Sequence, residues 1–402
     1  MSNNNWKNKT ILFLASQAIS LFGSTLVQFA IMWYITLETK SGVMMTISII
    51  CGFLPTFFLS PFGGVWADRY NRKLIIAISD SFIAFSTLIL AILFLMGHNY
   101  IWLLFVVSAI RSLGAGMQSP AIGAMLPQFV PQDKLIKVNG INSTIHSIVM
   151  LISPMFSAFL LSVASIETIF FIDVFTALIA VAVLIFFLKI PPHKKSLERK
   201  AKGYLTDLKE GLRYILAHKY IKHFFLFCLF FFFLIAPVSF LTPLQVTRNY
   251  GGEYWRLTGI EVAFSVGMML GGLIVSYFKL FKNKIRTMAF GAMITALTTF
   301  ALGLNIFFWL YLFIVLMMGL GVPLFHTNSN VLIQQKVEEE YLGRVFGILS
   351  MISSSMVPLG MLVFGPLADI VSIEIILLST GSALILLSIL LYFNKELLSH
   401  GE

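Results

Sequence analysis

Seven ionisable side chains interrupt apolar runs that are each long enough to cross a lipid bilayer. They are Asp80, Arg111, His146, Asp173, Glu261, His326 and Asp369. Burying such a group at membrane depth costs about 3 kcal/mol, so each is expected to face a wet cavity or a partner. Their chemistry is that of proton relays, interhelical ion pairs and sites for charged ligands. Asp369 stands at the end of its run, where solvation explains it.

Arg111 and Asp80 lie at depths that allow an ion pair. At 1.5 Å per residue, Arg111 lies roughly 15 Å inside its run and Asp80 about 10 Å in from the opposite side of the neighbouring run. We therefore predict that the two side chains pair. Such a pair would either tie two helices together or take part in gating or coupling.

The other titratable groups divide between the two halves. Asp173 and Glu261 each stand five residues inside a run, toward its outer end. Glu261 is the best candidate for a proton or cation site in the second half: unpaired, it could exchange protons, whereas paired with Arg256 it would be a gate or a structural tie. His146 and His326 are interpreted as hydrogen-bonded cavity or core residues, although a histidine can also carry protons near neutral pH.

A compact group of charges at residues 64–73 (Gly-Val-Trp-Ala-Asp-Arg-Tyr-Asn-Arg-Lys), here called the charged turn, separates two apolar runs. Arg69, Arg72 and Lys73 place three cations there, which indicates a cytoplasmic face. Asp68 is the one anion and needs a partner, such as a helix N-terminus or an arginine. The alternative is a stop-transfer cluster whose acid is merely solvated.

Sequence signatures of catalysis are missing. The chain has no GxxxxGK[ST] loop, no HExxH, CxxC or GxSxG, and no His or Cys cluster with metal-ligand spacing. We therefore expect no enzyme activity, no cofactor and no metal. Cys51 and Cys228 lie in apolar runs of different halves, which excludes a disulfide framework.

The composition is that of an integral membrane protein. Of 402 residues, 58% are hydrophobic and only 11% are charged. Runs of about 20 apolar residues, the length that spans a bilayer, recur along the whole chain. The predicted spans are 11–36, 43–66, 74–96, 101–123, 138–163, 169–188, 221–245, 257–278, 287–305, 309–333, 345–371 and 373–393. The fold class is thus all-α, with twelve transmembrane helices.

The positions of the cations set the predicted orientation. All but four of the 28 lysines and arginines fall on the side that holds both termini; the exceptions are Lys40, Arg111, Arg248 and Arg256. By the positive-inside rule both termini face the cytoplasm, and the protein is a multi-pass protein of the cell membrane. The net charge of +10 then reflects topology and contact with anionic membrane lipid. Nothing indicates nucleic-acid binding.

A polar linker divides the chain into two six-helix halves. Residues 189–220 join the half at 1–188 to the half at 221–402, and apolar residues at helical spacing in 205–216 predict an amphipathic helix on the inner membrane surface. Gly114 and Gly116 recur as Gly319 and Gly321, which indicates a pseudo-repeat of the kind found in two-lobed transporters.

Glycines and prolines occur at positions in the spans where they affect helix packing and helix continuity. Gly63 and Gly64 are expected to let helices approach closely just before the charged turn. Nine prolines interrupt spans, as suits helices that form moving walls: Pro55, Pro61, Pro120, Pro154, Pro237, Pro243, Pro323, Pro358 and Pro366.

The charged turn, the twelve spans and the polar linker together resemble the major facilitator superfamily. In the turn, Asn71 replaces the glycine usual before the second arginine. The resemblance implies that Gly64, Asp68, Arg69, Arg72 and Lys73 form the latch of one transport state.

The span-four residues Arg111, Gly114 and Gly116 resemble the superfamily motif linked to proton transfer, but the glycines come one residue early. Span five has Ser153 before Pro154, where drug antiporters usually have Gly-Pro. Despite these two differences, the resemblance implies proton coupling through Arg111. The acids inside the spans that could take part are Asp80, Asp173 and Glu261.

Short matches resemble the bacterial macrolide-efflux (Mef-type) branch. They are the opening Asn-Trp-Lys, residues 52–55 (Gly-Phe-Leu-Pro), 110–112 (Ile-Arg-Ser) and 340–346 (Glu-Tyr-Leu-Gly-Arg-Val-Phe). The resemblance implies a monomer that exports amphipathic small molecules such as macrolides in exchange for protons. Two alternatives stay open: an exporter or flippase of a natural metabolite, siderophore or lysolipid, and a transport-dead membrane sensor.

Overall fold

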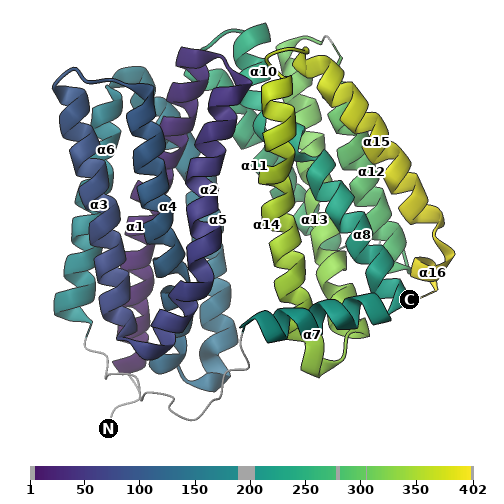
Figure 1. Cartoon of the computed structure of the whole chain (residues 1–402), viewed down its shortest axis with the longest axis horizontal. Coiled ribbons are helices and arrows are strands. Elements are labelled where there is room, and N and C mark those ends of the chain that lie inside the picture. Colours follow the sequence, from purple (N-terminus) through teal and green to yellow (C-terminus); the bar gives the residue numbers. More distant parts are fainter. Residues whose placement is uncertain (1–4, 189–203, 278–280, 305, 400–402) are drawn as a thin grey trace. The chain divides into compact units, whose positions relative to one another are not determined.

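The computed structural model describes residues 5–188, 204–277, 281–304 and 306–399 (Figure 1). Within these ranges all regular structure is helical, and eleven helices are long and apolar enough to cross a membrane, or twelve if one bent pair counts as a span. The predicted all-α membrane fold is therefore confirmed. The chain divides into two compact units: unit 1 comprises residues 1–38 and 47–200, and unit 2 comprises residues 39–46 and 201–402.

Unit 1 is a bundle in which α3 packs against both α4 and α6 (Figure 1). Its helices are α1 (Asn5–Thr39), α2 (Gly42–Arg69, whose first residues belong to unit 2), α3 (Arg72–Leu95), α4 (Ile101–Met125), the short η1 (Leu126–Gln128) and η2 (Gln132–Lys134), α5 (Leu135–Val163), α6 (Ile166–Ala182) and the π-helical η3 (Val183–Phe187).

Local sequence sets both ends of α3. At its start the Asn71 side chain accepts a hydrogen bond from the backbone N–H of Lys73 at 3.0 Å, an N-cap. At its end Gly97 has φ +84°, and its N–H donates to the carbonyl of Phe94 at 2.9 Å. A glycine adopts this left-handed conformation without a steric penalty, so the helix ends there.

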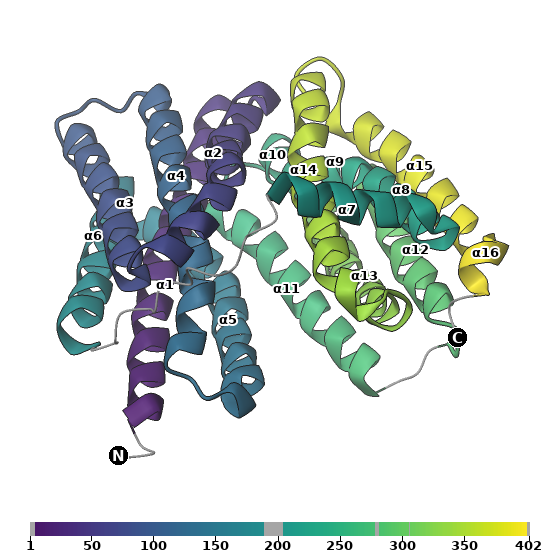
Figure 2. The same ribbon diagram turned by 60° about the horizontal axis from the view of Figure 1, so that its bottom comes forward.

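Unit 2 is a bundle in which α12 packs against α13 and α15, while α11 packs along α13 (Figures 1 and 2). Its helices are α7 (Tyr204–Ala217), α8 (Lys219–Leu234), α9 (Ala236–Phe240), α10 (Thr242–Asn249), α11 (Tyr254–Tyr277), α12 (Lys284–Leu302), α13 (Phe308–Lys336), α14 (Glu339–Leu367), α15 (Ile373–Phe393) and α16 (Lys395–Leu398).

The predicted span 221–245 is not one continuous helix. The chain breaks after α8 and again after α9, and Pro237 and Pro243 fall in the first turns of α9 and α10. Proline lacks the N–H that would continue the preceding helix but fits a first turn, so each proline starts a new helix.

An amphipathic helix, α7, follows residues 189–203 of the predicted linker, which lie outside the described part of the chain. It meets α8 at a bend of 111° and packs against α14 as well (Figures 1 and 2). Tyr214 and Ile215 are buried, whereas Leu212 and Leu216 are about half exposed. The helix thus has two apolar faces, of which one is free for the membrane surface.

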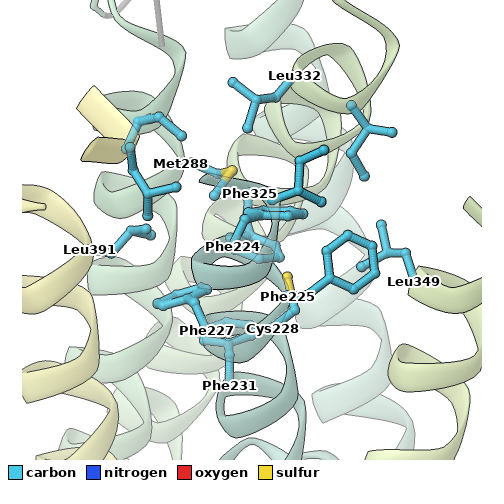
Figure 3. Close-up of a cluster of buried hydrophobic side chains, with 14 of the residues drawn as sticks. Phe224, Phe225, Phe227, Cys228, Phe231, Met288, Phe325, Leu332, Leu349 and Leu391 are labelled. Atoms are coloured by element: carbon cyan, nitrogen blue, oxygen red, sulfur yellow. The ribbon is translucent and has the colours of Figure 1, made fainter. Parts of the chain in front are cut away.

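Aromatic side chains fill the core of unit 2 beside α8 (Figure 3). Phe231 stacks on Phe325 with ring centroids 4.7 Å apart, and Phe227 contacts both rings. This packing fixes the angle at which α13 lies on α8, because large rings leave few alternative arrangements.

Candidate functional site

In the charged turn, α2 ends at Arg69 and α3 begins at Arg72. Arg72 is buried; its Nε donates to the carbonyl of Ala67 at 2.8 Å and its Nη1 to that of Ala124 at 2.6 Å. These bonds satisfy carbonyls near the ends of α2 and α4, where the helix dipole favours a cation. The side chains of Asp68 and Arg69 lie outside the described residues, so their latch role stays a prediction.

Lys73 acts in the same way on a third helix. Its Nζ donates to the carbonyls of Ile185 and Leu188, both at 2.9 Å, at the end of η3. The charged turn therefore draws the ends of α2, α4 and η3 together through cation-to-carbonyl bonds. The stop-transfer alternative concerns the acid of the turn, Asp68, whose side chain lies outside the described residues, so that alternative stays open.

The two glycines before the turn differ in their surroundings. A Cβ on Gly63 would lie 2.5 Å from the carbonyl oxygen of Gly116 on α4, whereas a Cβ on Gly64 would meet no atom of the described residues within 4 Å. Gly63 confirms the prediction of a close helix approach. Gly64 does not serve that purpose here, although a latch in another transport state could still require it.

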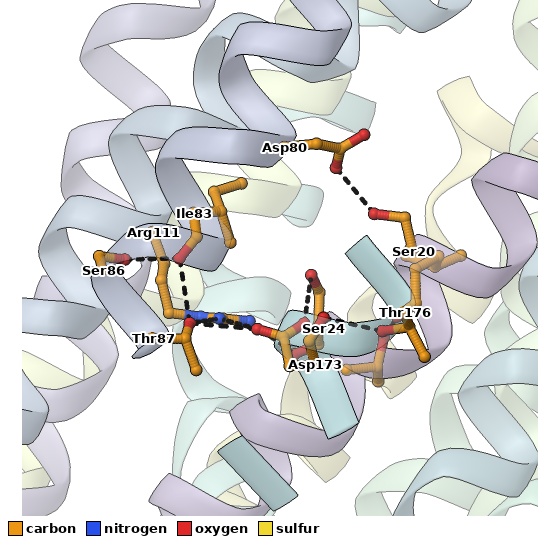
Figure 4. A network of polar contacts seen from close by, with 11 residues as sticks. Ser20, Ser24, Asp80, Ile83, Ser86, Thr87, Arg111, Asp173 and Thr176 are labelled. Atoms are coloured by element: carbon orange, nitrogen blue, oxygen red, sulfur yellow. Dashed lines mark hydrogen bonds and ion pairs between the residues drawn. The ribbon is translucent and has the colours of Figure 1, made fainter. Parts of the chain in front are cut away.

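Arg111 pairs with Asp173 and not with Asp80 as predicted (Figure 4). Its Nη1 contacts the Asp173 carboxylate and the Thr87 hydroxyl, and its Nη2 donates to the carbonyl of Ser24 at 3.2 Å. The Asp173 side chain is 1% exposed and that of Arg111 is 11% exposed. The prediction failed because depth along a span does not show which helices are neighbours.

Two further hydroxyl groups hold Asp173. Ser24 on α1 donates to its Oδ1 at 3.3 Å, and Thr87 lies 3.1 Å from its Oδ2. Gly23 allows α1 to come this close, since a Cβ there would lie 3.1 Å from the Cα of Asp173. The result is a buried ion pair whose remaining hydrogen-bonding capacity is largely satisfied, the arrangement that such a pair needs.

Asp80 is also buried but has no charged partner among the described residues (Figure 4). Ser20 and Gln118 both donate to its Oδ1 at 2.7 Å, while its Oδ2 has no hydrogen-bonding partner in the described part of the chain. Ser20 and Ser24 lie one turn apart on α1, so a single helix contacts both buried carboxyls of unit 1.

Glu261 lies half-buried on α11 of unit 2. No hydrogen bond or ion pair joins its side chain to another described residue. Arg256, its predicted alternative partner, pairs with Glu253 at 3.3 Å and lies over the Trp255 ring at 5.2 Å. The structure thus favours the unpaired alternative for this carboxyl.

Two glycines of the same helix lie against α13. A Cβ on Gly267 would lie 2.1 Å from the carbonyl oxygen of Leu316, and one on Gly271 would lie 2.5 Å from that of Leu320. Both contacts are with α13. They hold α11 tightly enough to fix the position of Glu261.

Comparison with known proteins shows the family. The family model described as Major Facilitator Superfamily matches residues 13–361. The chain belongs to this superfamily. It is 30% identical, over 98% of each chain, to Macrolide efflux protein A of Streptococcus pyogenes. It is 24% identical to the Staphyloferrin A transporter of Staphylococcus aureus, over 96% of this chain and 97% of that one.

A solved structure of the nucleoside transporter NupG has the same fold, with a TM-score of 0.71 at 15% identity, over 99% of this chain and 100% of that one. The protein is therefore a multi-pass membrane transporter of the major facilitator superfamily. Members carry small-molecule substrates and typically work as monomers. Among the described residues, no group of three or more His, Cys, Asp or Glu could hold a metal ion.

Sequence reasoning missed the role of Asp369 in this transporter. Its Oδ1 accepts from the backbone N–H of Gly42 at 2.7 Å and from Arg248 at 2.8 Å. Its Oδ2 accepts from the Ser41 hydroxyl at 2.7 Å and from the N–H of Val43 at 3.0 Å. Asp369, in the turn that follows α14, thus caps the N-terminus of α2.

Charge and close packing reinforce this cap, which lies wholly in unit 2. Arg248 also donates to the carbonyls of Lys40 and Ala368, both at 2.6 Å. A Cβ on Gly42 would lie 2.1 Å from the carbonyl oxygen of Gly365. Arg248 was the available sequence signal, because it is one of few cations predicted on the outer side.

We expect Asp369→Asn to loosen the start of α2. Partial burial would raise the pKa of Asp369, but hydrogen bonds from Ser41, Val43, Gly42 and Arg248 outweigh it and hold the pKa below its ordinary value. The carboxylate therefore stabilises this junction at neutral pH and loses that effect as the pH falls below about 4. Amide exchange at Gly42 and Val43 should become at least about tenfold faster in the variant.

The control for this variant is Glu253→Gln, which neutralises an exposed acid of the same unit. Exchange at Gly42 and Val43 should stay at the wild-type rate in that control. Equal exchange in Asp369→Asn and the wild type at pH 7 would show that the carboxylate does not hold the helix start.

Proposed function

We propose that this chain is a proton-coupled exporter of amphipathic drugs, macrolides among them, that works by alternating access. The observation that carries the proposal is Asp80, a buried carboxyl with one oxygen that has no partner among the described residues. A proton can bind there without breaking an ion pair. A proton on Asp173 would instead leave Arg111 buried without its counterion.

The macrolide-efflux relative supports the drug class, since the match runs over nearly the whole of both chains. Export of such a drug would make the host resistant to the antibiotic. The cation distribution supports a place in the cell membrane with both termini in the cytoplasm and contact with anionic lipid.

A second candidate is export of a siderophore or another natural metabolite, which the staphyloferrin relative favours. A lysolipid flippase and a transport-dead sensor are the remaining alternatives. Transport assays separate these candidates because only the first moves macrolides against a gradient.

The decisive experiment uses inverted membrane vesicles from a host that expresses the chain. Radiolabelled erythromycin should accumulate in vesicles with an acidic interior, by up to about tenfold per pH unit if one proton exchanges for one drug molecule. A protonophore should abolish the accumulation, and vesicles without the chain should show none. Accumulation that survives the protonophore would exclude proton coupling, and its absence throughout would leave the siderophore as the substrate to test.

We further propose that Gly64, Asp68, Arg69, Arg72 and Lys73 form a conformational latch. The bonds from Arg72 and Lys73 to helix ends support it, because these bonds must be remade if the helix ends separate. The surroundings of Gly64 support it as well: no described residue lies close enough to account for a glycine there.

Gly63 and Gly64 provide a matched test of the latch. Gly63→Ala should lower the free energy of unfolding by about 2 kcal/mol, since its Cβ would press on the Gly116 carbonyl. Gly64→Ala should unfold like the wild type, measured by thermal denaturation in nanodiscs, but should export several-fold more slowly. Wild-type export by Gly64→Ala would remove this residue from the latch.

A further inference from the structure

A cavity of about 180 Å³ lies within unit 2, bounded by α8, α13 and α14. Polar side chains form one wall: His326, Ser329 and Asn330 from α13 and Ser350 from α14. The sequence predicted His326 to be a hydrogen-bonded cavity or core residue; it lines this cavity, but no hydrogen bond joins its side chain to a described residue. Neither the charged turn nor the buried carboxyls touch this space.

The four polar side chains of this wall are free to bind a ligand. No hydrogen bond joins any of them to another described residue. Other hydroxyl groups in the same helices are committed: Ser354, for example, donates to the carbonyl of Ser350 at 2.7 Å. Ser329 is buried, whereas His326, Asn330 and Ser350 are exposed, so three of the four groups are open to an incoming ligand.

Aromatic side chains that belong to the core of unit 2 or pack against it also line the cavity. Phe232 and Phe325 line it, and both flank the His326 ring at centroid distances of 6.0 Å and 5.7 Å. Phe325 and Leu349, drawn in Figure 3, are buried members of the core cluster. Phe325 is only 2% exposed, so the aromatic surface that reaches the cavity comes mainly from Phe232 and from Phe346, which also lines it and is partly exposed.

The volume of the cavity and the absence of charged side chains from its described lining limit the class of ligand that it can hold. A site for a whole drug-sized molecule occupies about 300 to 1,000 Å³, whereas a cavity of about 150 Å³ can hold one six-membered ring. The described lining carries no Asp, Glu, Lys or Arg. The cavity thus fits one uncharged ring with an apolar face and several hydrogen-bonding oxygens.

We propose that this cavity is a subsite for a pyranose ring, the glycosyl part of an amphipathic substrate. The C–H face of the sugar packs on Phe232 and Phe346, while its hydroxyl groups bond to His326, Ser329, Asn330 and Ser350. This inference rests on the proposed export function and adds the part of the substrate that unit 2 recognises.

The test measures binding of phenyl β-D-glucopyranoside to the full chain in lipid nanodiscs by saturation-transfer NMR. The wild type should transfer saturation to the pyranose protons. The double variant His326→Phe/Asn330→Leu should weaken binding at least about tenfold, as expected for two or more lost hydrogen bonds. Both side chains are exposed, so the variant should fold normally. Ser350→Trp, also at an exposed position, should abolish binding by filling the cavity.

The matched control is Ser354→Ala, which removes a hydroxyl of α14 that does not line the cavity and should bind like the wild type. Unchanged binding in both cavity variants, or no transfer to the pyranose protons of the wild type, would overturn the subsite. Erythromycin transport by the same preparations separates this result from the proposed function. If glucoside binding responds to the cavity variants while erythromycin is not transported, the subsite stands and the macrolide assignment fails.

Discussion

Replacing Arg111 with alanine should destabilise the protein by about 3 to 5 kcal/mol, the cost of leaving a buried charge without its partner. Asp173 has a side chain only 1% exposed and would keep its hydroxyl partners but lose its cation. Equilibrium unfolding of the purified protein in mixed micelles measures the loss. Lys219→Ala is the control, since it breaks an exposed pair with Glu396 and should cost no more than about 1 kcal/mol.

A double-mutant cycle separates the structural from the coupling role of this pair. Arg111→Leu/Asp173→Leu removes both charges, and buried ion pairs replaced by apolar side chains often recover the lost stability. We expect stability near the wild type but no proton-driven transport, because α1 would lose the contact that links Ser24 to Asp173. Full transport by the double variant would show that the pair only ties helices together.

The sequence predicted which residues lie at membrane depth but not which of them meet. Arg111 and Asp80 were placed correctly along neighbouring helices, α4 and α3, yet Arg111 reaches past Thr87 on α3 to Asp173 on α6. The rise per residue of a helix gives the depth of a side chain in the membrane. The order of the helices around a bundle depends instead on which faces of the helices pack together. Apolar membrane helices reveal little of those faces, because lipid-facing and core-facing residues are equally hydrophobic.

Long-range capping was likewise beyond the sequence. Asp369 was assigned to solvent from its place at the end of a run, but Gly42 and Arg248, distant in sequence by 327 and 121 residues, bind it. Prolines were informative only in part. Pro237 and Pro243 were predicted to interrupt span seven, and they begin α9 and α10. The prediction was wrong for others, since α4, α5, α13 and α14 run without a break through Pro120, Pro154, Pro323, Pro358 and Pro366.

Asp80→Asn should abolish proton-driven accumulation of erythromycin while leaving exchange of the drug down its own gradient intact. Asparagine keeps the oxygen that accepts from Ser20 and Gln118, and its amide would occupy the position of Oδ2, which has no partner to lose among the described residues. The variant therefore resembles the permanently protonated side chain and should fold like the wild type.

Glu261→Gln is the comparison for Asp80→Asn, because it neutralises a carboxyl inside a span of unit 2 that likewise has no ion-pair partner among the described residues. Glu261 lacks the fixed donors that orient Asp80, so we expect its loss to slow export several-fold without uncoupling it. The measurement is the ratio of drug concentrations inside and outside the vesicles at a fixed pH difference. This ratio falls to one when coupling is lost and is unaffected when only the transport rate falls. If Asp80→Asn keeps the drug gradient and Glu261→Gln loses it, the residue that binds the coupled proton is in unit 2. A gradient kept by both variants would leave Asp173 as the remaining acid, with the Arg111 pair opening in each transport cycle.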